Sequence, residues 1–328
     1  RKRKKQIYVL IILMSIFSFL ELLTIGSFIP LLAGLNISTN SIEGLPYPFN
    51  YFSTKLQPDD FLLLISAIFI SITVLSSLIR VYTSKKQWDL IFQITSDISQ
   101  IMFRNIINQE YDFFLKAKSN IIISSANSSL KLLTTGTIIP VLNILGSMLL
   151  SFVLLIGLFF ISANSAILTI TVLGLFYYYF SKINKYALKK TSSLVVKSDS
   201  QRQKVLTESI GSIRDIIIDN TQDIFIKEYK INDLNYMSAQ AKASFLGSYP
   251  RFILEGLALF SFCLFAYFQT ATSSSTTSIT AIGSFSLAAI KLLPAAQILF
   301  ISISQMRFSS IAVSGILKYV MLPKNVKS

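Results

Sequence analysis

Long apolar runs alternate with polar stretches along the chain, and an apolar run of about 20 residues is enough for a helix to cross a bilayer. The pattern predicts membrane-spanning helices at about 7–35, 61–82, 132–161, 166–180, 252–268 and 281–303. The fourth run is short for a span, so we expect its helix to continue beyond the apolar part. The sequence therefore predicts an all-α membrane protein with six transmembrane helices.

Two connections between the predicted spans are long, yet they contain few Pro or Gly residues. Apolar residues recur in them at helical spacing, as between Leu90 and Met102. About twenty helical residues beyond each span would project ~30 Å. We therefore expect two helical hairpins outside the bilayer, with tips at about 110–120 and 219–229 and with Asp112 and Asn220 as helix-start residues.

Composition and charge place these elements relative to a membrane. The chain is 52% hydrophobic and 14% charged, whereas about a quarter of the residues in soluble domains are charged. Its net charge is +14, and among the loops on the other side only Lys55 is basic. The positive-inside rule therefore predicts that both termini and both hairpins are cytoplasmic. Nucleic-acid binding would also fit a basic chain, but the apolar content favours basic loops beside an anionic membrane.

Several functions are excluded by missing residue types. The chain has no histidine, and its single cysteine, Cys263, lies in an apolar run. These facts exclude histidine-based triads, histidine metal sites and an intrachain disulfide, so we expect no catalytic residue and no metal site. The chain also lacks the Gly-x-x-x-x-Gly-Lys-Ser/Thr phosphate loop. We expect no cofactor in this chain, and interpret it as a segment of a longer protein.

Charged residues inside the predicted spans are the candidate functional residues, because a charge at the bilayer centre costs about 3 kcal/mol or more. Glu21, Glu255 and Lys291 lie at similar depths in the first, fifth and sixth spans. Arg251 is one turn from Glu255 on the same helix face, and Arg80 is near the cytoplasmic end of the second span.

Two interpretations of these charges remain open. In the first, Arg80, Arg251 and Lys291 line a cavity and bind an anionic headgroup such as a pyrophosphate. In the second, Lys291 pairs with Glu255 to lock two helices together, while the two arginines extend to the membrane interface. A pair that opens when substrate arrives would satisfy both interpretations.

Pro294 lies three residues after Lys291 in the sixth predicted span. Proline removes one helical hydrogen bond and frees the carbonyl four residues earlier, at Ile290. We expect it to act as a hinge or to open a groove, with a packed, tolerated kink as the alternative.

The order of these features resembles the membrane domain of ABC exporters of the type IV fold, also described as the ABC transporter type 1 transmembrane domain. "YDFFLKAKSNIIISSANSSL" resembles the first coupling-helix region of that family, and "ESIGSIRDIIIDNTQDIF" is similar to the stretch before the second, although Gly211 comes one residue early and Ile217 replaces a common lysine. "FSFLELLTIGSFIPLLA", "YPRFILEGLALF" and "IKLLPAAQIL" resemble the first, fifth and sixth spans of the bacterial lipid-linked-oligosaccharide flippase group, with Lys291 where arginine is usual.

The resemblance implies how the hairpins and the missing motor work together. It implies a nucleotide-binding domain, on the same parent chain or a separate subunit, that carries ATP and Mg and receives the hairpin tips. It also implies a homodimer in which spans four and five are swapped onto the partner. The coupling residues it implies at the two tips are Asp112, Phe113, Phe114, Asp223 and Phe225. The alternative for the first tip is a surface helix that lies on the membrane.

The function that the resemblance implies is ATP-driven export or flipping by alternating access. The expected substrate is a lipid-linked (oligo)saccharide or a similar anionic amphipath in a bacterial inner membrane, and the full protein would be an ATP-hydrolysing translocase. Exporters of peptides, bacteriocins or hydrophobic drugs remain alternatives within the class. A secondary transporter or a non-transporting membrane scaffold is the alternative outside it, but the sequence lacks the inverted repeats of secondary transporters.

Overall fold

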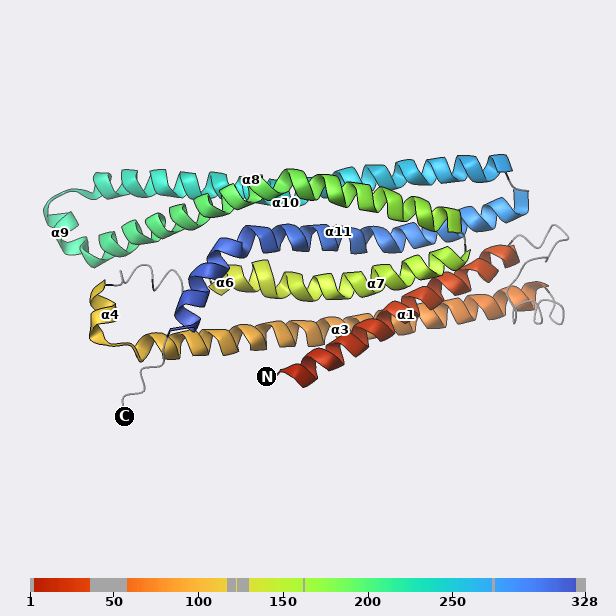
Figure 1. Ribbon diagram of the computed structural model, residues 1–328, viewed down its shortest axis with the longest axis horizontal. Coiled ribbons are helices and arrows are strands. Elements are labelled where there is room, and N and C mark those ends of the chain that lie inside the picture. The colour runs from red at the N-terminus through yellow and green to blue at the C-terminus, as the bar shows by residue number, and fades with distance from the viewer. Residues whose placement is uncertain are drawn as a thin grey trace. The chain divides into compact units, whose positions relative to one another are not determined.

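The computed structural model describes residues 3–35, 58–116, 122, 130–161, 163–272 and 275–322, and the elements in these ranges are helices. The long ones are α1 (Lys4–Leu35), α3 (Pro58–Ile107), α7 (Ile139–Ile161), α8 (Ala163–Gly211), α10 (Gln222–Thr272) and α11 (Ser275–Val320) (Figure 1). The short ones are α4 (Tyr111–Lys116), α6 (Leu130–Leu133), α9 (Ile213–Ile218) and the π-helix η2 (Thr134–Ile138). The predicted all-α fold is confirmed for this part of the chain.

Within the described ranges, five helical segments are long and apolar enough to cross a membrane: Lys4–Leu32, Asp60–Ile107, Leu130–Phe160, Gln222–Phe268 and Ser286–Ser310. Each of them overlaps one predicted span. The remaining predicted span, 166–180, lies within α8, which is not among the five. This helix continues as far as Gly211, as its short apolar part led us to expect.

The chain divides into two compact units. Unit 1 consists of Arg1–Trp88, Ile144–Tyr178 and Arg251–Leu299. Unit 2 consists of Asp89–Asn143, Tyr179–Pro250 and Phe300–Ser328. Helices α3, α7, α8, α10 and α11 each contribute residues to both units.

The core of unit 1 is built from five helices, α1, α7, α8, α10 and α11, and its buried members are Ile25, Leu154, Leu158, Ala166, Phe265, Ala288 and Leu292. Two glycines allow the helices to approach α1 closely. A Cβ on Gly157 would collide with Leu22, and a Cβ on Gly283 would collide with Leu32. The glycines therefore fix which faces of α7 and α11 lie against α1.

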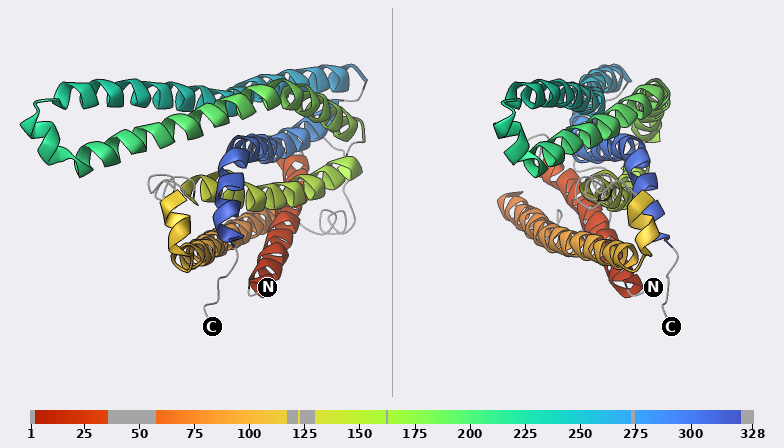
Figure 2. Two further views of the ribbon diagram at one scale, coloured as in Figure 1. Left: turned by 60° about the vertical axis from the view of Figure 1, so that its left-hand side comes forward. Right: turned by 90° about the vertical axis from the view of Figure 1, so that its left-hand side faces the viewer.

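The core of unit 2 joins the last turns of α3 to the last turns of α11. Met102, Ile106, Leu133 and Ile316 are buried together there. Asn105 donates a hydrogen bond from its amide nitrogen to the carbonyl of Val320 at 2.7 Å. In the same unit, α8 and α10 lie side by side and α9 connects them at the far end of this hairpin (Figure 2).

The π-helix η2 lies at the start of the third predicted span and is held by hydroxyl groups. The side chains of Thr95 and Thr134 share a hydrogen bond of 3.0 Å. Ser309 donates a hydrogen bond of 2.6 Å to the carbonyl of Gly136 and shares another of 2.9 Å with Thr137. Hydrogen bonds therefore join the π turn to both α3 and α11 within unit 2.

Candidate functional site

The charge at the centre of the sixth predicted span is paired. The ammonium of Lys291 on α11 lies 2.8 Å from Oε2 of Glu21 on α1. The Glu21 side chain is only 6% exposed, whereas that of Lys291 is 31% exposed. Ser76 on α3 donates a hydrogen bond of 3.3 Å to the other carboxylate oxygen of Glu21. Three helices of unit 1 thus meet at one buried carboxylate.

Residues of the apolar core of unit 1 are close in sequence to both members of this ion pair. Ile25 lies one turn after Glu21, and Ala288 and Leu292 flank Lys291, and all three of these apolar residues are buried. Leaving the buried Glu21 carboxylate without its cation would be strongly unfavourable, because an unpaired buried charge costs about 3–5 kcal/mol. The pair therefore holds α1 against α11 as long as no other ion replaces one of its members.

Arg80 on α3 contacts the turn of α1 that precedes Glu21. Its guanidinium carbon lies 5.7 Å from the centre of the Phe17 ring, which is a cation–π distance. Phe17 is one turn before Glu21, and Ser76 is one turn before Arg80. The predicted cations Arg80 and Lys291 therefore contact consecutive turns of the same helix.

Arg251 and Glu255 form a second charged pair, within α10. The Arg251 Nε lies 3.1 Å from Oε1 of Glu255, and the two side chains are 53% and 40% exposed. Gln297 on α11 donates a hydrogen bond of 3.0 Å to the same Glu255 oxygen. The alternative that Lys291 pairs with Glu255 is therefore wrong, because Lys291 binds Glu21 and Glu255 binds Arg251 and Gln297.

Pro294 lies inside α11, between Lys291 and Gln297, and its side chain is exposed. The helix is continuous from Ser275 to Val320 around it. Its role as a hinge therefore stays a prediction.

An apolar groove in unit 1 was not anticipated from the sequence. Three helices, α8, α10 and α11, line it, with Thr169, Val172, Phe176, Leu254, Leu257, Ala258, Ser261, Ala289, Leu292 and Leu293. None of Arg80, Arg251 and Lys291 is among the lining residues, although Leu254 and Leu292 adjoin charged neighbours along the chain. The groove offers hydrocarbon contacts with two hydroxyl groups.

The first predicted tip forms the short helix α4, which carries Asp112 in its first turn. The rings of Phe113 and Phe114 meet edge to face at 5.3 Å, and Phe114 is 37% exposed. Residues 117–120 of this predicted tip lie outside the described residues. The part that is described presents an aromatic turn at the end of α3 (Figure 1).

The second tip is placed differently from the prediction. Its short helix is α9, which ends before the predicted stretch 219–229 begins. Asn220 adopts a left-handed conformation with φ of 53° instead of starting a helix, and the backbone N–H of Ile224 bonds to the carbonyl of Thr221 as α10 begins. Asp223, which is exposed, and Phe225, which is half-buried, lie in the first turns of α10.

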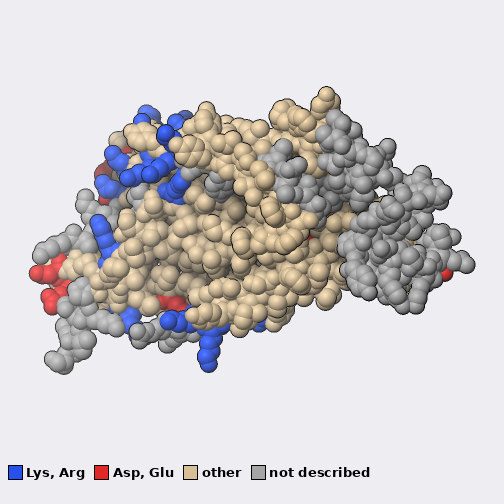
Figure 3. Space-filling model, turned by 45° about the vertical axis from the view of Figure 1, so that its right-hand side comes forward, with Lys and Arg blue, Asp and Glu red and all other residues tan. Residues whose placement is uncertain are grey.

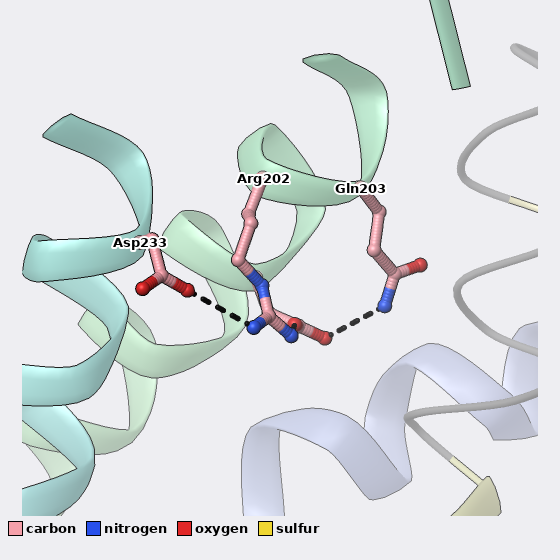
Figure 4. A network of polar contacts seen from close by, with 4 residues as sticks. Arg202, Gln203 and Asp233 are labelled. Carbon is pink, nitrogen blue, oxygen red and sulfur yellow. Dashed lines mark hydrogen bonds and ion pairs between the residues drawn. The ribbon is translucent and has the colours of Figure 1, made fainter. Parts of the chain in front are cut away.

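A polar cluster between α8 and α10 was also missed. Arg202 contacts Asp199 at 2.9 Å on its own helix and Asp233 at 3.2 Å on α10, and Gln203 donates a hydrogen bond of 3.0 Å to Asp199 (Figure 4). The guanidinium also lies 4.3 Å from the centre of the Tyr236 ring. Burial by itself lowers the pKa of Arg202, but the hydrogen bonds with Asp233 and Asp199 outweigh it, so that its pKa is raised.

Comparison with known proteins identifies one family. The model for the ABC transporter transmembrane region matches residues 7–293, which is most of the chain. A search of curated proteins finds no significant match. The matched range includes Glu21, Arg80, Arg251 and Lys291.

Proposed function

Since the chain belongs to the ABC transporter transmembrane region family, we propose that it is the membrane half of an ATP-driven flippase or exporter that moves an anionic amphipath. A lipid-linked (oligo)saccharide is the substrate class that the charges favour. The resemblance to ABC exporters favours a homodimer in a bacterial inner membrane. We place both termini in the cytoplasm, because the basic residues concentrate in the predicted cytoplasmic connections.

The ion pair between Lys291 and Glu21 is the observation that carries this proposal. Its carboxylate is buried while its ammonium is partly exposed, so an anion can approach the lysine without first unpacking the core. Arg80 on the adjacent turn of α1 adds a second cation. A phosphate or pyrophosphate that binds there would compete with Glu21 for Lys291, since charge-assisted hydrogen bonds to phosphate oxygens are strong.

Energy for the cycle would come from nucleotide-binding domains, where ATP and Mg²⁺ bind. The aromatic turn of α4, with Asp112, Phe113 and Phe114, is the contact we assign to the first hairpin. For the second hairpin we assign Asp223 and Phe225 together with the preceding helix α9. Movement of the hairpins would then change which side of the membrane the charged site faces.

A double substitution tests whether Lys291 binds substrate or only pairs. In the complete transporter in vesicles, Lys291→Met alone leaves Glu21 buried without its partner, whereas Lys291→Met with Glu21→Gln removes both charges. Replacing both members of a buried pair is often neutral for folding. We expect the double variant to accumulate and to keep basal ATPase activity, but to lose about tenfold or more of its transport of a fluorescent polyprenyl-pyrophosphate-linked sugar, as expected when a contact worth about 1.5–3 kcal/mol is lost.

Ser76→Ala is the matched control, because it removes a hydroxyl that donates to the same carboxylate without removing a cation. Its transport should stay close to that of the wild type. If the double variant folds and transports the pyrophosphate-linked sugar at the wild-type rate, the pair is structural and the proposed substrate class is wrong.

The apolar groove favours a second candidate, an exporter of hydrophobic drugs. Its lining is mainly aliphatic, with Leu254, Leu257 and Leu293 among its residues. The same variants separate the two candidates. A drug exporter would keep its transport of an uncharged dye after both charges are removed.

A further inference from the structure

One face of α8 combines tyrosines and lysines just beyond the end of the fourth predicted span. Tyr179 and Tyr186 are 61% and 77% exposed. Between and after them lie four exposed lysines, Lys182, Lys185, Lys189 and Lys190. At about 100° per residue, all six side chains fall within less than half of the helix circumference. They form a continuous face in unit 2, which we call the Tyr-Lys face.

The orientation of this face is settled by the opposite side of the helix. Asn184, Leu188, Ser192 and Val195 are buried, each at 2% exposure or less. The Ser192 hydroxyl bonds to the carbonyl of Phe308 on α11, and Tyr249 on α10 donates a hydrogen bond of 2.9 Å to Asn184. Because α8 is fixed on that side, the Tyr-Lys face points away from the rest of its unit.

Among the described residues, no acidic side chain forms an ion pair with the four lysines of this face. The described ion pairs of unit 2 lie further along α8 and involve Arg202 and Lys204. Four like charges within three turns repel one another unless anions neutralise them. On the side visible in Figure 3, Lys and Arg side chains lie toward the upper left and along the lower edge, and a broad area between them lacks such side chains.

Tyr179, Lys182 and Lys185 lie at the level of the lipid headgroup layer, and Lys189 and Lys190 lie just beyond it. The predicted span ends at Phe180, so Lys182 lies ~3 Å and Lys189 ~14 Å further along the axis. Headgroup regions are about 5–8 Å thick on each side of the hydrocarbon, and lysine stems extend back toward the membrane. Tyrosine is enriched at this depth because its ring is apolar and its hydroxyl is polar.

We propose that the Tyr-Lys face of α8 binds the phosphodiester headgroup of anionic phospholipids in the cytoplasmic leaflet. The lysines supply the charge, and Tyr179 and Tyr186 supply ring contacts at the same level. The site is separate from the charged pair on α1 and α11, and it does not depend on which substrate the transporter carries.

Amine footprinting of the complete transporter tests the proposal. The protein is placed in nanodiscs of phosphatidylcholine alone or with phosphatidylglycerol and is treated with an acetylating reagent. We expect phosphatidylglycerol to slow the acetylation of Lys182, Lys185 and Lys189 several-fold at low salt, and high salt to reverse this, because the contact is screened. Lys227 and Lys230, which are exposed on α10 and ~33 Å or more from the predicted span, should react equally in both lipids.

A pair of charge-matched variants measures the affinity. Lys182→Gln, Lys185→Gln and Lys189→Gln together remove three charges from the face, and Lys197→Gln, Lys227→Gln and Lys230→Gln remove three charges from positions further out. We expect the first variant to lose about tenfold in retained phosphatidylglycerol by native mass spectrometry, from the contribution of basic residues near an anionic surface, and the second to match the wild type.

Equal losses in the two variants would mean non-specific attraction and would overturn the site. Equal protection of the lysines in phosphatidylcholine alone would mean that protein or any phospholipid headgroup covers the face without a need for anionic lipid, and that too would overturn the proposal. If the Lys182→Gln, Lys185→Gln and Lys189→Gln variant does not insert into the membrane, the acetylation rates of the wild-type protein in the two lipid mixtures still test the proposal.

Discussion

Arg202 is the residue whose geometry best explains a contact between two helices. Its planar guanidinium donates to one carboxylate on α8 and to another on α10, and its face lies over an aromatic ring. A lysine carries the same charge, but as a point, and cannot reproduce this fork. The guanidinium is charged throughout the accessible pH range, so this contact between α8 and α10 is always made by a cation.

Removing this guanidinium should weaken the hairpin. Arg202→Met leaves Asp199, whose side chain is 12% exposed, without a cation, and we expect a loss of about 1–3 kcal/mol in unfolding free energy. Lys204→Met is the matched control, because its 3.8 Å contact with Glu208 is exposed and such pairs contribute little. Thermal unfolding in detergent measures both. Equal melting temperatures would show that Arg202 contributes no more than a surface lysine.

The candidate charges could be found from the sequence because a lysine or glutamate stands out within an apolar run. Their partners could not be found. Depth along a helix follows from counting residues, and by depth Glu21 and Glu255 are equivalent neighbours of Lys291. Which of them contacts it depends on the rotation of each helix and on the packing of α1 against α11, which Gly283 and Leu32 help to set.

Among the elements, the π-helix η2 shows how tightly one glycine can fix a junction. The carbonyl of Gly136 accepts a hydrogen bond from Ser309, and a Cβ at this position would overlap the Ser309 side chain. No local pattern in "TTGTI" predicts a π turn, because the turn is selected by hydroxyl groups that arrive from α3 and α11. Asn220, which we expected to start a helix, has a left-handed conformation instead.

Gly136→Ala is therefore expected to destabilise unit 2. Overpacking a well-packed site costs about 1–3 kcal/mol, and the melting temperature in detergent should fall accordingly. The control is Gly247→Ala on α10, where no atom lies within 4 Å of the added Cβ, and where alanine favours the helix by about 0.5–1 kcal/mol. A variant at Gly136 that melts with the wild type would contradict the close approach.

At the scale of the whole molecule, the exposed apolar surface is the dominant feature. The most apolar windows of α3 and α10 are only 11% buried, so most of their apolar side chains require lipid or another chain around them. The sequence predicted this much, because membrane spans and basic connections are read from composition along the chain. It could not predict how the long helices divide between two units, since that depends on contacts between distant segments.

Cysteine labelling tests the predicted topology of the full chain. In a Cys263→Ser background, cysteines replace Tyr111 and Ile217, which are exposed at the two hairpins, and Ser41 in a predicted outer loop. An impermeant maleimide should label the hairpin positions only in inverted vesicles and position 41 only in right-side-out vesicles. The same sidedness at all three positions would refute the assignment of both hairpins to the cytoplasm.

The π turn also has an evolutionary consequence. A π turn holds about one residue more than an α turn, so losing a single residue from Thr134–Ile138 would restore α geometry and shift the remaining residues of the turn by one position relative to the flanking helices. The hydroxyls of Thr134 and Thr137 would then no longer both meet their present partners. Related chains with a deletion at this point should therefore also have exchanged the residues that stand at Thr95 and Ser309.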